Sequence, residues 1–348
     1  YKKTFTVAPE DSVKVTSIVF DGVYRNSSVW INGHYLGKRP NGYISFRYNL
    51  TPYLYYGNRQ NEIIVKADNS KQPNSRWYSG SGIYRNVWLE TTDKLHVAAD
   101  GTFVTTPQVS AQKATVTLQT IIKNDYAAQK TAKVSTTLYK GDDKITSVDT
   151  ETTIPANAEK ALSQETTVNN PVLWNVETPE LYSAVTTIEI DGEVVDSYAT
   201  PFGIRSFTFD LDKGFILNGK QVKIKGVCLH HDLGALGSAF NTRAMERQLQ
   251  IMKDMGVNGI RTSHNPPAPE LLDLCDKMGF IVMDEAFDMW KQAKTPFDYS
   301  NDWDAWHKKD LAFTRSSLIM SGRLDSPPAD AVGQGTSDPP DACRDPAK

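Results

Sequence analysis

The sequence predicts a multidomain protein that combines β domains with an α/β domain. Over residues 1–98, and again over 99–203, short alternating apolar and polar runs are separated by turn residues, which is typical of antiparallel strands. Over residues 204–321 strands alternate with amphipathic helices instead, which is typical of a parallel sheet. Residues 322–348 are rich in Pro, Asp, Ala and Gly, and we expect a disordered or non-native tail there.

The first domain, residues 1–98, is expected to be a β-sandwich or jelly roll. Runs such as 13–20 and 62–67 carry the alternation, and no amphipathic helix interrupts them. Asn32 and Gly33 follow Ile31, and this pair tolerates positive φ at both central positions of a type I′ turn. We therefore predict a hairpin at this point.

The second domain, residues 99–203, is expected to be a small immunoglobulin-like β-sandwich. Strand-like runs at 114–122, 133–139 and 184–190 recur with turn signals between them. The domain contains no cysteine, so the disulfide of antibody domains is absent. The sequence predicts the sandwich architecture alone.

Three strands are predicted in the third domain, at 222–227, 257–261 and 280–284. The last is a continuous apolar run, typical of a parallel strand that is covered on both faces. Such strands begin an α/β barrel, in which functional residues follow the carboxyl ends of the strands.

Two helices separate these strands. The first spans 242–255 and ends at Gly256, with an apolar face that consists of Met245, Leu249, Met252 and Met255. The second spans 269–278 and ends at Gly279.

Composition excludes several classes of partner. Lys plus Arg total 38 and Asp plus Glu total 41, so a net charge of −3 favours neither a nucleic acid nor an anionic membrane. No apolar run of about 18 residues exists, so no membrane span is predicted. Cys228, Cys275 and Cys343 are too scattered for a disulfide framework or a cysteine metal site, and we expect free thiols.

Imidazole and carboxyl groups follow the three predicted strands of the third domain. They are His230, His231, Asp232, His264, Asp284, Glu285 and Asp288. Such groups can bind a metal, hydrogen-bond ligand hydroxyls, act as acid and base, or only cap the strand ends. Adjacent histidines point in opposite directions in an extended chain, so a dedicated metal site is disfavoured.

Two further features carry candidate contacts. Arg261 can fix a carboxylate in a ligand site, or form a structural ion pair with Asp284 or Glu285, and the two roles are compatible. The segment 74–85 is dense in aromatic and glycine residues, including Asn74, Arg76 and Trp77. Its aromatic rings could stack on ligand rings, but composition alone favours a place in the core.

These segments together resemble glycoside hydrolase family 2, and most closely its bacterial β-galactosidase-like members. The matching segments are 75–85 (SRWYSGSGIYR), 173–174 (LW), 179–182 (PELY), 202–205 (FGIR), 218–220 (NGK), 225–227 (KGV) with His230, 260–264 (IRTSH), 274–276 (LCD) and 282–285 (VMDE). The resemblance implies a jelly-roll sugar-binding domain, an immunoglobulin-like sandwich and the start of a (β/α)₈ TIM barrel.

The resemblance also implies a carbohydrate substrate and the residues that bind it. These are His230, Arg261, His264, Asn265, Asp284 and Glu285 of the barrel, with Asn74, Arg76 and Trp77 of the first domain. No cofactor is expected. A divalent or monovalent metal occurs in the family, but nothing in this sequence supports one.

The resemblance covers residues 1 to about 311, and the opening strands of the first domain are expected to be missing. Family members are retaining enzymes that use two glutamates, which follow the fourth and seventh barrel strands. Neither is matched here, so we assign no catalytic residue and expect the chain as given to be inactive.

The leading interpretation is a retaining glycosidase for terminal β-linked sugars, with β-galactosides as the expected substrates. A glucuronide-specific site would need added cationic donors, and the sequence does not reveal them. The alternatives are a non-catalytic carbohydrate-binding β-sandwich protein and a metal-dependent hydrolase at His230, His264 and Asp284. A homo-oligomeric full-length form and a bacterial cytoplasmic or periplasmic location stay open.

Overall fold

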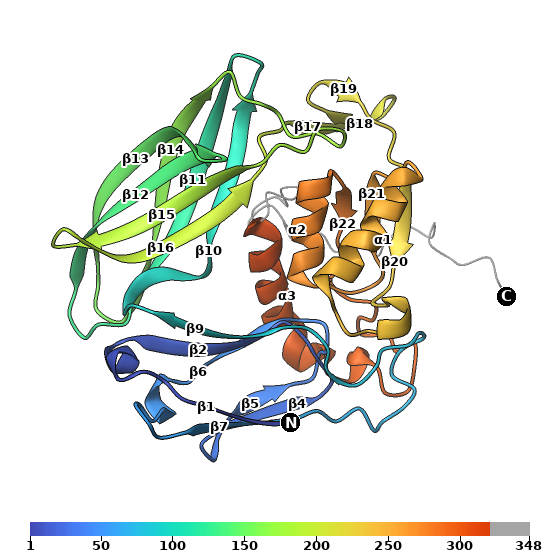
Figure 1. The fold of residues 1–348 in the computed structure, drawn as a ribbon. Coiled ribbons are helices and arrows are strands. Elements are labelled where there is room, and N and C mark those ends of the chain that lie inside the picture. Colours follow the sequence, from blue (N-terminus) through green and yellow to red (C-terminus); the bar gives the residue numbers. More distant parts are fainter. Residues whose placement is uncertain (321–348) are drawn as a thin grey trace.

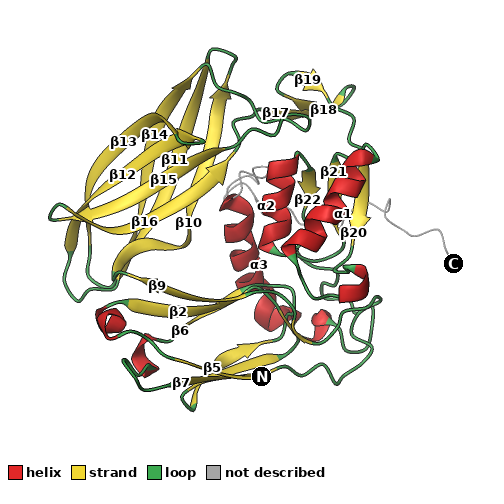
Figure 2. Ribbon diagram, viewed as in Figure 1, coloured by secondary structure: helices red, strands yellow, loops and turns green. Residues whose placement is uncertain are grey.

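The structure is a computed structural model that describes residues 1–320 of the chain, with side chains through residue 311. Two β domains and an α/β domain follow one another along the sequence (Figure 1). Helices are concentrated in the α/β domain, whereas the first two domains consist of strands and loops apart from short 3₁₀ turns (Figure 2). The tail predicted at 322–348, including Cys343, lies outside the described residues.

The first domain is a jelly roll in which two main sheets enclose an apolar core. One sheet has the order β1 (Lys2–Phe5), β7 (Asn61–Lys66), β4 (Ser27–Ile31), β5 (His34–Arg39). The other has the order β6 (Phe46–Asn49), β2 (Val15–Phe20), β9 (Val87–Thr92), and β3 (Val23–Tyr24) pairs separately with β8 (Gly82–Ile83). Two 3₁₀ turns, Pro9–Val13 and Thr51–Tyr53, complete it.

Side chains from both main sheets fill this core. Phe20 and Phe46 stack at 5.0 Å between ring centroids, and Ile31 is fully buried beside them. Asn32 and Gly33 adopt φ values of 48° and 84°, which confirms the predicted type I′ hairpin between β4 and β5.

The second domain is a sandwich of a three-stranded and a four-stranded antiparallel sheet. The first has the order β10 (Leu95–Val109), β11 (Lys113–Asn124), β14 (Ala158–Asn169). The second has the order β13 (Asp143–Ile154), β12 (Lys130–Lys140), β15 (Tyr182–Ile190), β16 (Glu193–Phe202). The runs predicted at 114–122, 133–139 and 184–190 lie within β11, β12 and β15.

A small antiparallel sheet connects this sandwich to the α/β domain. It consists of β17 (Phe207–Asp210), β18 (Gly214–Leu217) and β19 (Lys220–Gln221). Trp174 is buried against Phe215 and Leu217 of β18. Its Nε1 donates a hydrogen bond to the Asp276 carbonyl at 2.8 Å, so the indole joins the sandwich to the α/β domain.

The α/β domain contains a parallel sheet of order β20-β21-β22, with helices packed against it. In chain order its elements are β20 (Gly226–Leu229), the 3₁₀ turn Gly234–Leu236, α1 (Thr242–Asp254), β21 (Gly259–Thr262), α2 (Pro269–Met278), β22 (Ile281–Met283), the 3₁₀ turn Tyr299–Asn301 and α3 (Trp303–Met320). Both predicted helices are present, and α2 has the predicted bounds. Helix α3 lies beside β10 of the sandwich (Figure 1).

The first predicted strand of this domain was placed too early. Residues 222–225 are not a strand, and β20 begins at Gly226. The reason is Asn258, whose side chain accepts from the Lys225 backbone N–H at 2.7 Å and donates to the Lys223 carbonyl at 3.1 Å. These bonds occupy backbone groups that a sheet partner would otherwise use.

Two predictions of burial were also wrong. Met255 is 74% exposed, because it lies at the C-cap of α1 and turns away from the face that Met245 and Leu249 bury. The last strand was expected to be covered on both faces, but Met283 of β22 is 63% exposed.

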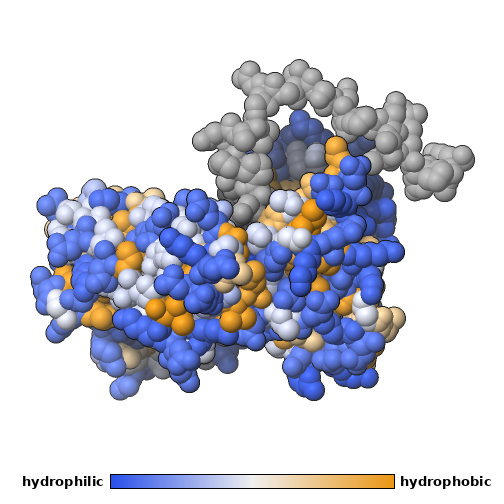
Figure 3. Space-filling model, turned by 90° about the horizontal axis from the view of Figure 1, so that it is seen from above, coloured by the Kyte–Doolittle hydropathy of each residue, from blue (hydrophilic) through white to orange (hydrophobic). Residues whose placement is uncertain are grey.

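The surface offers no single large apolar face in the view of Figure 3, where hydrophobic residues form scattered patches among hydrophilic ones. Over residues 1–320, no helix has both the length and the apolar character that crossing a membrane requires. Cys228 is exposed and Cys275 is buried, and both are free thiols, as predicted.

Candidate functional site

The parallel sheet brings the predicted polar residues to one edge. His230 follows the end of β20, His264 lies two residues beyond β21, and Asp284 and Glu285 follow β22. The three strands run in the same direction, so their carboxyl ends meet at one edge of the sheet. Residues far apart in the sequence thereby form one cluster.

Glu285 is the centre of this cluster. Its Oε1 accepts a hydrogen bond from Arg261 Nε at 2.5 Å, and its Oε2 lies 2.7 Å from His264 Nδ1. The two predicted roles of Arg261, ion pairing and fixing a carboxylate, thus coincide at one residue. Arg261 and His264 together hold the carboxylate in a fixed orientation.

Thr262 was missed by sequence reasoning, although it organises the same strand ends. Its hydroxyl donates to Asp284 Oδ1 at 2.9 Å and accepts from the Glu285 backbone N–H at 3.1 Å. Thr262 is only 2% exposed. A buried threonine in a strand carries no sequence signal that separates this role from ordinary packing.

A loop of the jelly roll reaches this cluster. The Trp77 ring lies 5.0 Å from the His230 ring and 5.6 Å from the His264 ring, measured between centroids. Partial burial, to which the nearby His264 adds, lowers the pKa of His230 below its usual value. The indole and the two imidazoles form an aromatic corner in which His230 is neutral.

Arg76 of the same loop pairs with Asp288, a residue on the β22 side of the cluster. Arg76 Nη2 and Lys294 Nζ both contact Asp288 Oδ1, at 2.8 and 2.9 Å. The Asp288 side chain is 2% exposed, and its Oδ2 has no hydrogen-bond partner. Lys294 was missed because it lies in an irregular loop without periodicity, and its presence corrects the expectation that no further cation lies here.

Two predicted residues lie beneath this surface. Asn74 is 4% exposed, and its amide bonds with Tyr24, Asn69 and Lys71 keep it within the jelly roll. Asn265 is 6% exposed and borders a cavity of about 30 Å³ that Asp288 also borders. Neither lines the open hollow over the cluster.

That hollow has a volume of about 560 Å³. Its lining combines charged and aromatic side chains, among them Arg76, Arg261, His264, Glu285, Trp290 and Trp303. The volume is within the roughly 300–1,000 Å³ typical of small-molecule sites. A lining that combines polar groups with flat rings suits a ring-shaped ligand that carries hydroxyls.

Comparison with protein families decides the identity of this arrangement. Three models of one family match in succession: the sugar binding domain of glycosyl hydrolases family 2 over residues 1–93, a further family 2 model over 95–205, and the family 2 TIM barrel domain over 211–309. The chain belongs to glycoside hydrolase family 2.

Individual family 2 proteins agree with this assignment. The chain is 53% identical to β-galactosidase BoGH2A of Bacteroides ovatus, over 89% of this chain and 36% of that protein. It is 32% identical to a β-glucuronidase of Bacteroides fragilis, over 82% of this chain and 42% of that protein. The chain thus spans about two fifths of the length of these relatives.

The fold of this family 2 chain matches a solved structure. A glycosyl hydrolase family 2 member from Bacteroides cellulosilyticus superimposes with a TM-score of 0.89 at 35% identity, over 92% of this chain and 41% of that one. The jelly roll, the immunoglobulin-like sandwich and the beginning of the TIM barrel are therefore the fold of the chain.

Within the family 2 site, Arg85 of the jelly roll supports the segment that carries His264. Its guanidinium donates to the carbonyls of Asp21, Tyr43 and Pro266, at 3.1, 2.9 and 2.7 Å. His231 Nε2 lies 3.2 Å from the Pro266 oxygen, and burial lowers the pKa of His231 to about 3, so the ring is neutral and donates. The two adjacent histidines thus have separate roles.

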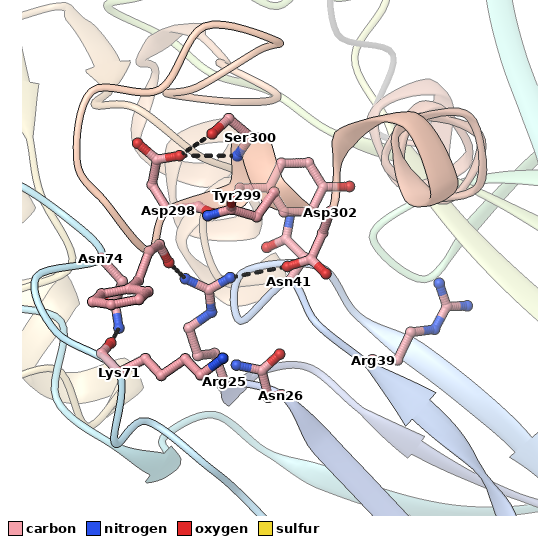
Figure 4. A network of polar contacts seen from close by, with 12 residues as sticks. Arg25, Asn26, Arg39, Asn41, Lys71, Asn74, Asp298, Tyr299, Ser300 and Asp302 are labelled. Carbon is pink, nitrogen blue, oxygen red and sulfur yellow. Dashed lines mark hydrogen bonds and ion pairs between the residues drawn. The ribbon is translucent and has the colours of Figure 1, made fainter.

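A second anchor fixes the loop after β22. Figure 4 shows the Arg25 guanidinium against Asp302, at 3.2 Å. The same guanidinium donates to the Phe297 carbonyl at 2.7 Å. Asp298 is fully buried and accepts bonds from Ser300 and from the Lys294 backbone N–H. The jelly roll therefore fixes the loop that presents Asp288 and Lys294.

No metal site emerges from the described part of the chain, where no three His, Cys, Asp or Glu residues are grouped as ligands. A second hollow of about 410 Å³ lies between the jelly roll, the sandwich and α2, and it shares only Asp284 with the strand-end cluster. Its lining is strongly acidic, with Asp21, Glu90, Asp100 and Glu270 among its residues. We therefore place the candidate site at the strand ends.

Proposed function

We propose that this chain supplies the sugar-binding wall of a retaining glycosidase for terminal β-linked sugars, with β-galactosides as its substrates. The observation that carries the proposal is the cluster of Arg261, His264 and Glu285, which lines the 560 Å³ hollow. The Trp77 ring lies against this cluster, 5.6 Å from the His264 ring between centroids. Ionised and aromatic groups fixed in this way can bond to hydroxyls and stack on a pyranose ring. The β-galactosidase name of a relative with 53% identity supports this sugar.

The proposal assigns no catalytic carboxylate to this chain. A retaining mechanism needs two carboxyl groups about 5 Å apart, one to donate a proton and one to attack the sugar. Glu285 is occupied by Arg261 and His264, and Asp288 is occupied by Arg76 and Lys294. We infer that these carboxylates orient the sugar, and that the chain as given hydrolyses no glycoside.

Galactose is favoured over glucuronate by the pairing of the added cations. Arg76 and Lys294 line the hollow and could bind a sugar carboxylate there. Both, however, already contact the same oxygen of Asp288. Their charge is partly neutralised before any ligand arrives. A β-glucuronidase among the relatives makes glucuronate the comparison sugar for the test.

The test is calorimetric titration of the full chain with galactose and with glucuronate. Trp77→Ala is expected to weaken galactose binding about tenfold, as expected for one lost ring contact. Tyr35→Ala, on a jelly-roll strand outside the site, is the exposed aromatic control. Tighter binding of glucuronate would overturn the choice of sugar, and absence of all sugar binding would overturn the proposal.

A parallel assay uses a nitrophenyl β-galactoside. The purified chain is expected to give no turnover above that of buffer, and measurable turnover that tracks the protein concentration would contradict the assignment of no catalytic carboxylate.

The non-catalytic sugar-binding alternative makes a different prediction. If the jelly roll alone bound the sugar, as its contribution of Arg76 and Trp77 allows, His264→Ala would leave galactose affinity unchanged. Our proposal requires that His264→Ala and Trp77→Ala both weaken it.

A further inference from the structure

Asp284 and Glu285 are adjacent carboxylates at the end of β22, but their side chains contact opposite faces of the parallel sheet. Arg261 and Thr262 are successive residues of β21, so their side chains point to opposite faces. Glu285 Oε1 accepts a hydrogen bond from Arg261, whereas Asp284 Oδ1 accepts one from the Thr262 hydroxyl. The two carboxylates therefore serve different sides of the same strand ends.

The surroundings of Asp284 differ from those of Glu285. Glu285 lines the 560 Å³ hollow, and the Arg261 side chain beside it is 42% exposed. Thr262 is 2% exposed, and Asp284 borders the second hollow, of about 410 Å³, together with Glu270 of α2. Asp284 is not among the described residues that line the 560 Å³ hollow. It lies behind the face on which we place the sugar.

The Thr262 hydroxyl connects the two sides. It lies 2.9 Å from Asp284 Oδ1 and 3.1 Å from the backbone nitrogen of Glu285. A backbone N–H can only donate, so the hydroxyl accepts there and directs its single proton at Asp284. Asp284 thus determines which way the hydroxyl points, and the hydroxyl in turn holds the main chain of Glu285.

The main-chain position of Glu285 determines what its side chain can hold. Its two carboxylate oxygens contact different partners, Arg261 at 2.5 Å and His264 at 2.7 Å. A carboxylate reaches two fixed partners at once only when its own backbone is held in place. The strand ladder does not supply that support, since β22 ends at Met283. The Thr262 hydroxyl supplies it, as the acceptor for the Glu285 N–H.

We propose that Asp284 is a positioning residue, which acts through the Thr262 hydroxyl to fix Glu285 in the cluster that binds the sugar. This inference rests on the proposed function, because it assigns Glu285 to a sugar-binding cluster. Asp284 itself makes no contact with the sugar. It sets the geometry of the sugar-binding carboxylate from the opposite face of the sheet.

The experiment is calorimetric titration of the full chain with galactose. Thr262→Val keeps the shape of the side chain but removes the hydroxyl, and it is expected to weaken galactose binding about fivefold. Thr262→Ser keeps the hydroxyl, so its affinity should stay within about twofold of that of the unmodified chain. Asp284→Ala should weaken binding about threefold, because the hydroxyl loses the acceptor that orients it. The double variant should lose no more than Thr262→Val alone, since both changes break the same connection.

Hydrogen exchange of the Glu285 backbone amide gives a readout that requires no ligand. This amide should exchange faster in Thr262→Val and in Asp284→Ala, and as slowly in Thr262→Ser as in the unmodified chain. Thr136→Val is the matched control, because Thr136 is also buried and its hydroxyl donates to Gln164 Oε1 at 2.8 Å within the sandwich. It should leave both the galactose affinity and the exchange of Glu285 unchanged.

Each of three results would overturn this role of Asp284. Unchanged galactose affinity in Thr262→Val would show that the hydroxyl only stabilises the fold. An additional loss when Asp284→Ala is combined with Thr262→Val would mean that Asp284 acts on the sugar directly. If the unmodified chain binds no galactose, the proposed function fails and the positioning role falls with it. Losses in both single variants that do not add in the double variant would support the inference.

Discussion

Single residues carry most of the chemistry of this chain, and Glu285 is the clearest case. Its side chain joins Arg261 and His264, which come from a different strand end. Glu285→Gln keeps the shape of the side chain but removes the charge that fixes both partners. We expect galactose affinity to fall about tenfold, which is the effect of losing about 1.4 kcal/mol of binding free energy, a modest amount because the Arg261 side chain is 42% exposed.

Calorimetry measures that loss, and Glu180→Gln is its control. Glu180 forms an exposed ion pair with Lys140 away from the hollow, and such pairs contribute little. Unchanged galactose affinity in Glu285→Gln would show that the cluster is structural only.

Asp21 provides a prediction about pH. Burial raises the pKa of Asp21 from 3.8 to about 6, and Glu270 adds to the effect, while the bond from Trp88 Nε1 at 2.8 Å opposes it. Between pH 4 and 6 the unfolded chain loses this proton while the folded chain keeps it. The contribution of Asp21 is therefore most favourable below pH 4 and is lost as the pH rises through about 6.

Asp21→Asn keeps an acceptor for Trp88 and removes the charge. It is expected to raise the free energy of unfolding by about 2 kcal/mol at pH 7.5 and to have little effect at pH 3.5. Urea unfolding at the two pH values measures both. A variant that is less stable at pH 7.5, or equally stabilised at both, would contradict the assignment.

At the residue scale, the sequence reveals functional groups that follow strands, but not those whose role depends on a distant partner. His230, His264 and Glu285 were found because the ends of parallel strands converge. Thr262 and Lys294 were not found, since nothing local distinguishes them from packing and surface residues. Asn74 was predicted in the site together with its sequence neighbours Arg76 and Trp77. Its amide bonds instead keep it within its own loop.

Helix ends illustrate what determines an element. Gly279 ends α2 with φ of 76°, and a Cβ at this position would approach the Val176 carbonyl oxygen at 2.5 Å. Gly256, which follows α1, has φ of 84°, but a Cβ there would meet nothing within 4 Å. At Gly256 only the left-handed backbone conformation requires glycine. At Gly279 the close approach of the Val176 carbonyl requires it as well.

Gly256→Ala is therefore expected to cost about 1 kcal/mol, the usual penalty of a left-handed alanine. Gly279→Ala should cost about 2 kcal/mol more, because the backbone of residue 176 must move. Equilibrium unfolding in urea measures the difference. Equal losses would show that the contact with Val176 relaxes freely.

Elements with local signals were predicted well, and those with remote ones were not. The bounds of α2 follow from Pro269 at its start and Gly279 at its end, which lie within the segment itself. The start of β20 depends on Asn258, which is more than thirty residues away along the chain. No periodicity in 222–227 could have placed it.

At the scale of the whole molecule, arginines of the jelly roll bind the α/β domain at several separate points. Arg25 contacts Asp302, Arg39 contacts Asp310, Arg76 contacts Asp288, and Arg85 reaches the Pro266 carbonyl. The order of the domains follows from the sequence pattern, but these contacts do not. No sequence pattern distinguishes an arginine on the surface from one between two domains. The site is therefore a property of the assembled domains.

Arg85 tests this dependence most directly, because it is 6% exposed and bonds to three carbonyls in two domains. Arg85→Met keeps much of the volume but leaves those oxygens without their donor, which should lower the free energy of unfolding by about 3 kcal/mol. The Pro266 carbonyl then loses the Arg85 bond and keeps the one to His231. Because Pro266 lies in the segment that carries His264, that segment is held less firmly, and galactose affinity should fall as well. Arg243→Met, at a side chain that is 77% exposed, should change neither quantity. If Arg85→Met unfolds more easily but binds galactose as before, the domains are joined for stability alone, and the strand-end cluster is organised without the jelly roll.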